Sequence, residues 1–158
     1  MGAPGFGFLM ASLGLGALAG GLSLALLGGS ASGGRQFWVG LFWAASLLGF
    51  SVSRWMPLSM LLLFVAGVGQ MWFLATANTR IQMATPDRLR GRVMAFYAQA
   101  MMGVGPLGAL QAGVLATALG APAAMSIGAA ISALVLVAVR VWQRPVFTLQ
   151  PEVAARDI

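Results

Sequence analysis

The chain has 158 residues, of which 59% are hydrophobic and only 8% are charged, and its net charge is +6. Soluble domains average about 25% charged residues, so this chain cannot solvate a globular surface and its outside must contact lipid. It has no cysteine and no histidine, which excludes a disulfide framework and a thiol or Cys-type zinc site. All its basic residues are arginines, which we assign to the flanks of membrane spans rather than to nucleic-acid binding.

Five apolar stretches reach or approach the length of about 20 residues that a spanning helix needs. The sequence therefore predicts an all-α fold, a polytopic membrane helical bundle over residues 1–145 with a cytoplasmic tail over residues 146–158. A cleaved signal peptide is a poor alternative for the first stretch, because no charge precedes it and it is long and rich in glycine. In chain order the expected spans cover about residues 4–27, 36–52, 57–78, 93–119 and 122–142, the second being the shortest.

The arginines predict the orientation. If the loops alternate across the membrane, one side receives eight arginines and the other side receives Arg54 alone. Basic residues stay on the cytoplasmic side, so we expect the N-terminus outside and the C-terminus inside. No ionisable residue falls in the middle of a span, where it would cost about 2.5–3.5 kcal/mol. The eight are Arg35, Arg80, Arg88, Arg90, Arg92, Arg140, Arg144 and Arg156.

The first and fourth spans are built on small residues, whereas the second and fifth are bulky. Small residues let helix backbones approach closely in lipid, so we expect the first and fourth spans to pack inside an assembly and the other two to face lipid. The motif Leu-Gly-Ala-Leu occurs at residues 15–18 and again at 107–110, as an inverted repeat of three helices would give. The expected packing residues are Gly14, Gly16, Gly20, Gly103, Gly105, Pro106 and Gly108.

Residues 103–108 match the dinucleotide fingerprint GxGxxG. That fingerprint needs a preceding strand in a βαβ unit, and here it lies inside an apolar span and contains Pro106. We interpret it as a kinked, closely packed helix, and we expect no cofactor.

Few polar side chains lie inside the spans. Gln70, Asn78 and Gln111 are candidates for lining a water-filled path, and the alternative is hydrogen bonding between helices, worth about 0.6 kcal/mol on average. Enzymatic chemistry is not expected, because there is no histidine or lysine to act as a base and two of the three acids lie in the tail.

Residues 85–92, Thr-Pro-Asp-Arg-Leu-Arg-Gly-Arg, are the densest cluster of charge. We expect a cytoplasmic turn there, with Thr85 as the N-cap of the next helix, Pro86 at its first position and Asp87 in its first turn. Arg88 is expected to pair with a neighbouring acid or with lipid phosphate. The cluster is either a basic anchor at the headgroups or a gating contact, and the gating candidates are Asp87, Arg88, Arg90 and Arg92.

Residues 77–82 (Ala-Asn-Thr-Arg-Ile-Gln), 85–94 and 103–113 closely resemble the second half of major facilitator superfamily transporters. The nearest branch is similar to the enterobactin-exporter-like group, whose members are mostly bacterial exporters. The resemblance implies that the five spans correspond to helices eight to twelve of a twelve-helix transporter. The loop at residues 28–35 departs from the family pattern, because it keeps only Arg35 of the usual charges.

This resemblance implies the C-terminal part of an exporter of a small molecule in the bacterial inner membrane, proton-coupled when complete. The expected partners are the lipid bilayer and a missing N-terminal transporter half or another membrane protein, with no nucleic acid. The alternative is a small non-transporting membrane protein, or an inactive remnant, that packs against a larger membrane partner.

Overall fold

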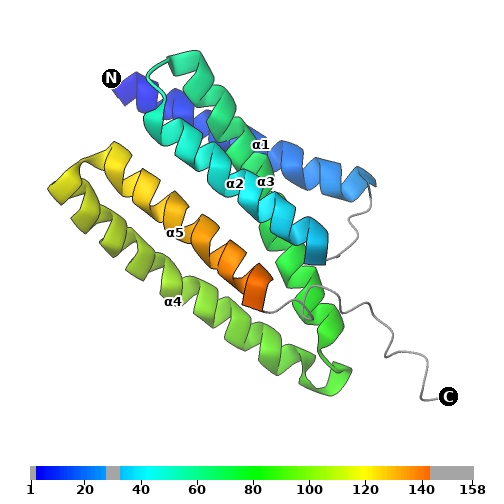
Figure 1. Ribbon diagram of the computed structural model, residues 1–158. Coiled ribbons are helices and arrows are strands. Elements are labelled where there is room, and N and C mark those ends of the chain that lie inside the picture. The colour runs from blue at the N-terminus through cyan, green and yellow to red at the C-terminus, as the bar shows by residue number, and fades with distance from the viewer. Residues whose placement is uncertain (1–2, 28–32, 143–158) are drawn as a thin grey trace.

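The computed structural model describes residues 3–27 and 33–142 of the chain (Figure 1). These residues form five α-helices and no strand, which confirms the predicted all-α fold. The expected tail over residues 146–158 lies outside the described residues. The helices are α1 (Ala3–Leu27), α2 (Gly33–Val52), α3 (Met56–Ala84), α4 (Asp87–Leu119) and α5 (Ala121–Trp142).

Four helices, α1, α3, α4 and α5, are long and apolar enough to cross a membrane by length and composition. The shortest of the five, α2, has 20 residues and is not among these four. Its first turn carries Gly34, Arg35 and Gln36, which belong at the membrane surface. The apolar remainder, residues 37–52, measures ~24 Å at ~1.5 Å per residue, less than the ~30 Å of a bilayer core.

The helices pack in an order that differs from their order in the chain. α3 packs against α1 and α2, α2 packs against α3 and α5, and α4 packs against α5 and meets α3 slightly (Figure 1). Among the described residues α1 and α2 make no contact with each other. The resulting sequence of neighbours, α1–α3–α2–α5–α4, leaves α1 and α4 at the two edges of the bundle.

The interface of α1 and α3 brings two backbones together. A Cβ atom placed on Gly16 would collide with the carbonyl oxygen of Phe64, and one placed on Gly67 would collide with the carbonyl oxygen of Leu13. Gly20 is also tight, with the carbonyl oxygen of Val68 at 3.0 Å from such an atom. Close backbone approach is one source of helix association in lipid, where no hydrophobic force acts between helices.

Most of the buried side chains are small. No large side chain is fully buried among the described residues. Ala66 is completely covered, and the other buried positions include alanines and serines of α2, α3 and α5. Helices with such surfaces approach closely and gain many van der Waals contacts.

Helix α2 has a packed side and an open side. Gly40 lies against the ring of Phe73 in α3 and against Leu136 in α5, and Phe37 is buried. Trp38 and Phe42 are exposed. The bulky side chains that suggested lipid contact therefore divide between the two sides of the helix.

Helix α4 is the least covered helix. Every residue from Met101 to Val114 is exposed, and no residue of the helix is buried. It ends at Gly120, whose φ of 87° lies in the left-handed region that glycine adopts without strain. Gly120 alone connects α4 to α5, and the two helices lie antiparallel (Figure 1).

A Gly16→Ala substitution tests the close approach of α1 and α3. The added methyl group would press on the backbone of Phe64, and we expect the free energy of unfolding to fall by about 1–3 kcal/mol. The matched control is Gly14→Ala in the same helix, where nothing described lies within 4 Å of the new atom. Thermal unfolding in detergent measures both, and equal stability of the two variants would contradict the packing.

Candidate functional site

The charged side chains collect at one end of the bundle. Arg35 begins α2, Arg80 lies near the end of α3, and Arg140 is in the last turn of α5. Arg88, Arg90 and Arg92 start α4 at the same end, whereas Arg54 stands alone in the turn between α2 and α3 at the other end. Arg144 and Arg156 lie outside the described residues. Successive helices run in opposite directions, so the turns between them fall alternately at the two ends of the bundle. The arginines cluster because most of them lie near the turns of one end.

The first turn of α2 connects the arginines of three helices. Arg80 donates a hydrogen bond of 2.8 Å from Nη1 to Oε1 of Gln36. The guanidinium of Arg35 lies 5.3 Å from the centre of the Trp72 ring, and that of Arg140 lies 5.6 Å from the centre of the Phe37 ring. Cation–π contacts of this kind contribute about 0.5–1 kcal/mol at exposed sites, so the basic end is also a packed end.

The turn between α3 and α4 consists of Thr85 and Pro86 alone. The predicted caps are wrong by one residue, because the N-cap of α4 is Pro86, and Thr85 instead ends α3. The Thr85 hydroxyl donates to the carbonyl oxygen of Ile81 at 2.6 Å. A helix C-terminus has carbonyl groups without partners, and this one draws the threonine hydroxyl back onto α3.

Asp87, at the start of α4, pairs with Arg90 and not with Arg88. The other partner expected for Arg88, lipid phosphate, stays a prediction. Arg90 Nη2 lies 2.6 Å from Asp87 Oδ1, one turn along α4. The Nε of Arg90 also donates to the carbonyl oxygen of Gln82 in α3, at 3.4 Å. Asp87 lies in the first turn of α4, where the helix dipole stabilises a negative charge. Arg90 thus joins the start of α4 to the end of α3.

The other two predicted gating residues are solvated. Arg88 and Arg92 are exposed, and within the described residues neither makes a hydrogen bond or an ion pair. They are available to headgroups or to another segment.

Serine hydroxyls, which the sequence did not single out, connect the helices. Trp72 Nε1 donates to Ser23 Oγ at 2.8 Å, which links α3 to α1. Ser126 and Ser51 join α5 to α2 through hydroxyl oxygens 2.7 Å apart. A serine in a helix often bonds its own backbone, so its presence in the sequence does not signal a contact with another helix.

The predicted cavity residues lie on two helices that hardly touch. Gln70 is half-buried in the middle of α3, and Asn78 accepts a hydrogen bond of 2.9 Å from Gln82 one turn along the same helix. Gln111 is exposed on α4. The described residues do not bring the three together around one cavity.

The predicted packing glycines divide between α1 and α4. Gly16 and Gly20 lie against α3. At Gly14, and at Gly103, Gly105 and Gly108 of α4, no described atom lies within 4 Å of where a Cβ atom would stand. Pro106 lies inside α4, where that helix is exposed. The small-residue side of α4 is therefore open within the described part of the chain.

Long apolar helices that pack through small residues and carry their arginines at one end define an integral membrane protein. A comparison with protein families matches residues 1–156 to the family described as transmembrane secretion effector. The chain belongs to this family, a group of transporters of the major facilitator type. Comparisons with curated proteins and with solved structures give no match.

An Arg90→Gln substitution tests the connection between α3 and α4. The change removes both the ion pair with Asp87 and the bond to Gln82. We expect amide hydrogen exchange over residues 82–90 to accelerate about two- to fivefold, as suits an exposed pair worth roughly 0.5–1 kcal/mol. Arg88→Gln is the matched control with the same loss of charge. Equal exchange in the two variants would mean that the Asp87–Arg90 pair does not hold the turn.

Proposed function

We propose that the chain forms part of a small-molecule exporter in the bacterial inner membrane, and that a second segment completes it by packing on α4. The proposal rests on the different surroundings of two glycines, Gly16 and Gly108. Gly16 and Gly108 occupy the same place in the two copies of Leu-Gly-Ala-Leu. Gly16 lies against the backbone of Phe64, whereas Gly108 has no described neighbour within 4 Å.

The exposure of α4 supports a missing neighbour. Small residues in a membrane helix favour close approach of another helix, and α4 carries them along a stretch that is exposed throughout. A transport path needs helices on both of its sides, and the described helices form a row with α1 and α4 at its edges. In this proposal Gln111 and the glycines of α4 face the path or the helix that closes it, and Gln70 and Asn78 of α3 stay separate candidates for lining the path.

Proton coupling, which we propose for the complete exporter, requires a group that titrates within the membrane. In the described spans there is no such carboxyl group, since the one described acid, Asp87, lies at the turn and pairs with Arg90. The coupling acid would therefore come from the completing segment. In the same proposal Asp87, Arg88, Arg90 and Arg92 form a cytoplasmic gating contact with that segment, and no residue has an enzymatic role. The block from Ala77 to Met94 supports the enterobactin-exporter-like branch.

A second candidate is a membrane protein that does not itself transport and that binds a larger partner through α4. The same open glycines favour it. The two candidates differ in one outcome, because both predict assembly and only the exporter predicts efflux.

Labelling of single cysteines tests the orientation. The N-terminus is proposed outside and the C-terminus in the cytoplasm, from the arginines at one end of the bundle. In intact cells an impermeant maleimide is expected to label Arg54→Cys and to leave Arg88→Cys unlabelled until the cells are opened. Arg88 suits the test because it is exposed and makes no hydrogen bond or ion pair within the described residues. The reverse labelling pattern would overturn the orientation.

Co-expression with the N-terminal seven helices of a transporter of the same family tests the completing segment. We expect the two pieces to co-purify, and Gly108→Leu to reduce the recovery about tenfold, as an overpacked contact costs about 1–3 kcal/mol. Gly108→Leu should leave the thermal unfolding of the chain alone unchanged. Gly16→Leu, the matched change in the other copy of the motif, should lower it. Full recovery of Gly108→Leu would contradict packing on that side of α4.

Efflux of a panel of fluorescent dyes from the same cells separates the two candidates. Cells with the chain alone are expected to accumulate dye as cells with an empty vector do. Cells with both pieces should accumulate less. Efflux by the chain alone would overturn the need for a second segment, and assembly without efflux would favour the non-transporting candidate.

A further inference from the structure

Helix α2 is the shortest helix of the described chain, and charged residues mark both ends of its apolar part. Arg35 precedes the apolar residues 37–52 at the basic end, and Arg54 follows them at the other end. The apolar part rises ~24 Å at ~1.5 Å per residue, whereas the hydrocarbon core of an average bilayer is ~30 Å thick. The helix is therefore roughly 6 Å too short for an average bilayer.

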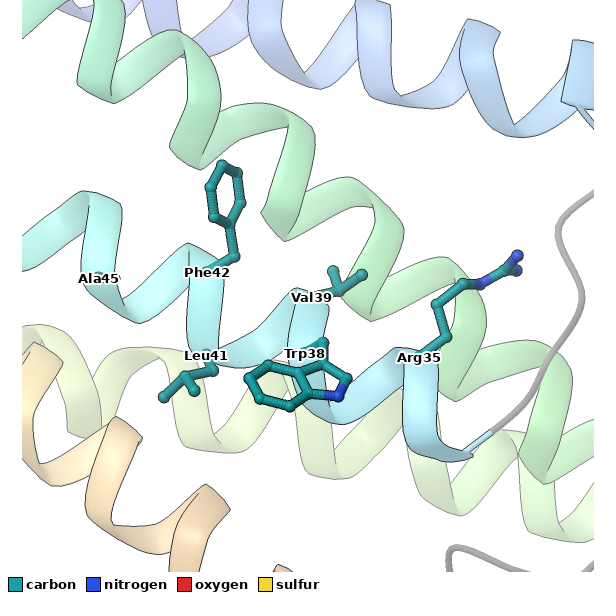
Figure 2. Close-up of a pocket in the computed structure, with 6 residues that line it drawn as sticks. All are labelled: Arg35, Trp38, Val39, Leu41, Phe42 and Ala45. Atoms are coloured by element: carbon teal, nitrogen blue, oxygen red, sulfur yellow. The ribbon is translucent and has the colours of Figure 1, made fainter.

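Two exposed tryptophans mark nearly the same distance. Trp38 lies near the start of α2, and Trp55 lies in the turn that follows the helix; both are exposed. Figure 2 shows Trp38 and Phe42 following Arg35 along the helix. Tryptophan favours the boundary between water and hydrocarbon at both faces of a membrane, and helical rise over residues 38–55 gives at most ~26 Å.

The arginines at the basic end are held at the level of the first turn of α2. A short helix often fits a thicker bilayer because its terminal arginines extend outward to the headgroups. Here the guanidinium of Arg35 lies 5.3 Å from the centre of the Trp72 ring, and that of Arg140 lies 5.6 Å from the centre of the Phe37 ring. Extending either arginine would break its contact with a neighbouring helix, so the basic level is fixed.

Helix α5 is held in register with α2 by contacts at both ends. At the basic end Arg140 lies over the ring of Phe37. At the other end the hydroxyl oxygens of Ser126 and Ser51 lie 2.7 Å apart. The rise from Ser126 to Arg140 is ~21 Å, which agrees with the short apolar part of α2. The two helices therefore present one thin apolar band rather than two bands at different heights.

The helices at the edges of the bundle are longer. Helix α1 measures ~37 Å over its 25 residues, and the apolar part of α4, residues 93–119, measures ~40 Å. Figure 1 shows α1 crossing α3 obliquely. A long helix fits a thinner membrane when it tilts, but a short helix cannot stretch. The thickness that suits the bundle is therefore set by α2.

We propose that the side of the bundle formed by α2 and α5 fits a bilayer with a hydrocarbon core of about 24 Å, and that the protein gathers phospholipids with short acyl chains on this side. The partner is the lipid bilayer, and the property that is selected is acyl-chain length rather than headgroup charge. The inference does not depend on transport or on a completing segment, because that segment is proposed to pack on α4.

Fluorescence quenching in mixed vesicles tests the proposal. The full chain is placed in dioleoyl phosphatidylcholine brominated on its acyl chains, mixed with an unbrominated phosphatidylcholine that carries dimyristoleoyl, dipalmitoleoyl, dioleoyl or dierucoyl chains. A preferred lipid displaces the quencher from the exposed tryptophans Trp38, Trp55 and Trp142, which lie at the ends of α2 and α5. We expect dipalmitoleoyl chains to be preferred over dierucoyl chains about three- to fivefold, because the cost grows with each ångström of mismatch.

Three variants test whether α2 sets the preferred thickness. Arg54 is exposed and makes no hydrogen bond or ion pair within the described residues. Arg54→Leu extends the apolar part of α2 towards Trp55, and the preferred acyl chains are expected to lengthen by one step of the series. Arg54→Lys keeps a charge at the same level and should leave the preference unchanged. Arg88→Leu, at the basic end of α4, is the matched loss of charge away from α2 and should also leave it unchanged.

Three results would count against the proposal. Equal displacement of the quencher by every lipid of the series would mean that thickness is not selected or that another protein covers α2 and α5. A preference for dioleoyl or longer chains would overturn the thin fit. An unchanged preference in Arg54→Leu, with thermal unfolding equal to that of Arg54→Lys, would exclude α2 as the helix that sets the thickness. If Arg54→Leu is less stable, the lipid series with the unmodified chain decides.

Discussion

Hydrocarbon offers no water to a peptide group, so every backbone N–H and C=O within the membrane needs a partner in the protein. Helices meet this constraint within a single segment, which is why the described residues form a series of long helices. The same solvent removes the hydrophobic force between helices and leaves close packing and a few hydrogen bonds to assemble them. Where α1 meets α3, Gly16 and Gly67 meet this need by allowing two backbones to touch.

The same constraint places the charged side chains at the ends of the bundle, where they also connect neighbouring helices. Arg35, Arg80 and Arg140 lie at the basic end because a charge in the bilayer centre is costly. At the ends they do not only face water, since each contacts a neighbouring helix through an amide or an aromatic ring. The first turn of α2 is thus both an anchor at the membrane surface and a joint between helices.

Much of the fold could be predicted because it depends on local properties. The apolar span that was expected to end near Asn78 belongs to a helix that continues to Ala84, and the span expected from near Val93 belongs to a helix that begins at Asp87. Helices do not stop where apolar residues stop, because their hydrogen bonds are internal and continue into water. The caps at Thr85 and Pro86 were misplaced by one residue, since the choice depends on which helix the threonine hydroxyl joins. The contacts of Ser23 and Ser51 were missed because a hydroxyl can bond its own helix equally well.

The two copies of Leu-Gly-Ala-Leu separate what the sequence decides from what it cannot. By itself the sequence determined the class of protein, the helices and the basic end, because length, apolarity and charge act residue by residue. The order in which the helices pack was decided only by the tertiary structure. In the structure Gly16 lies against the backbone of Phe64, whereas Gly108 has no described neighbour within 4 Å, although both belong to the same Leu-Gly-Ala-Leu motif. A small residue permits close approach but does not choose the neighbour, because that choice depends on the surface that another helix presents.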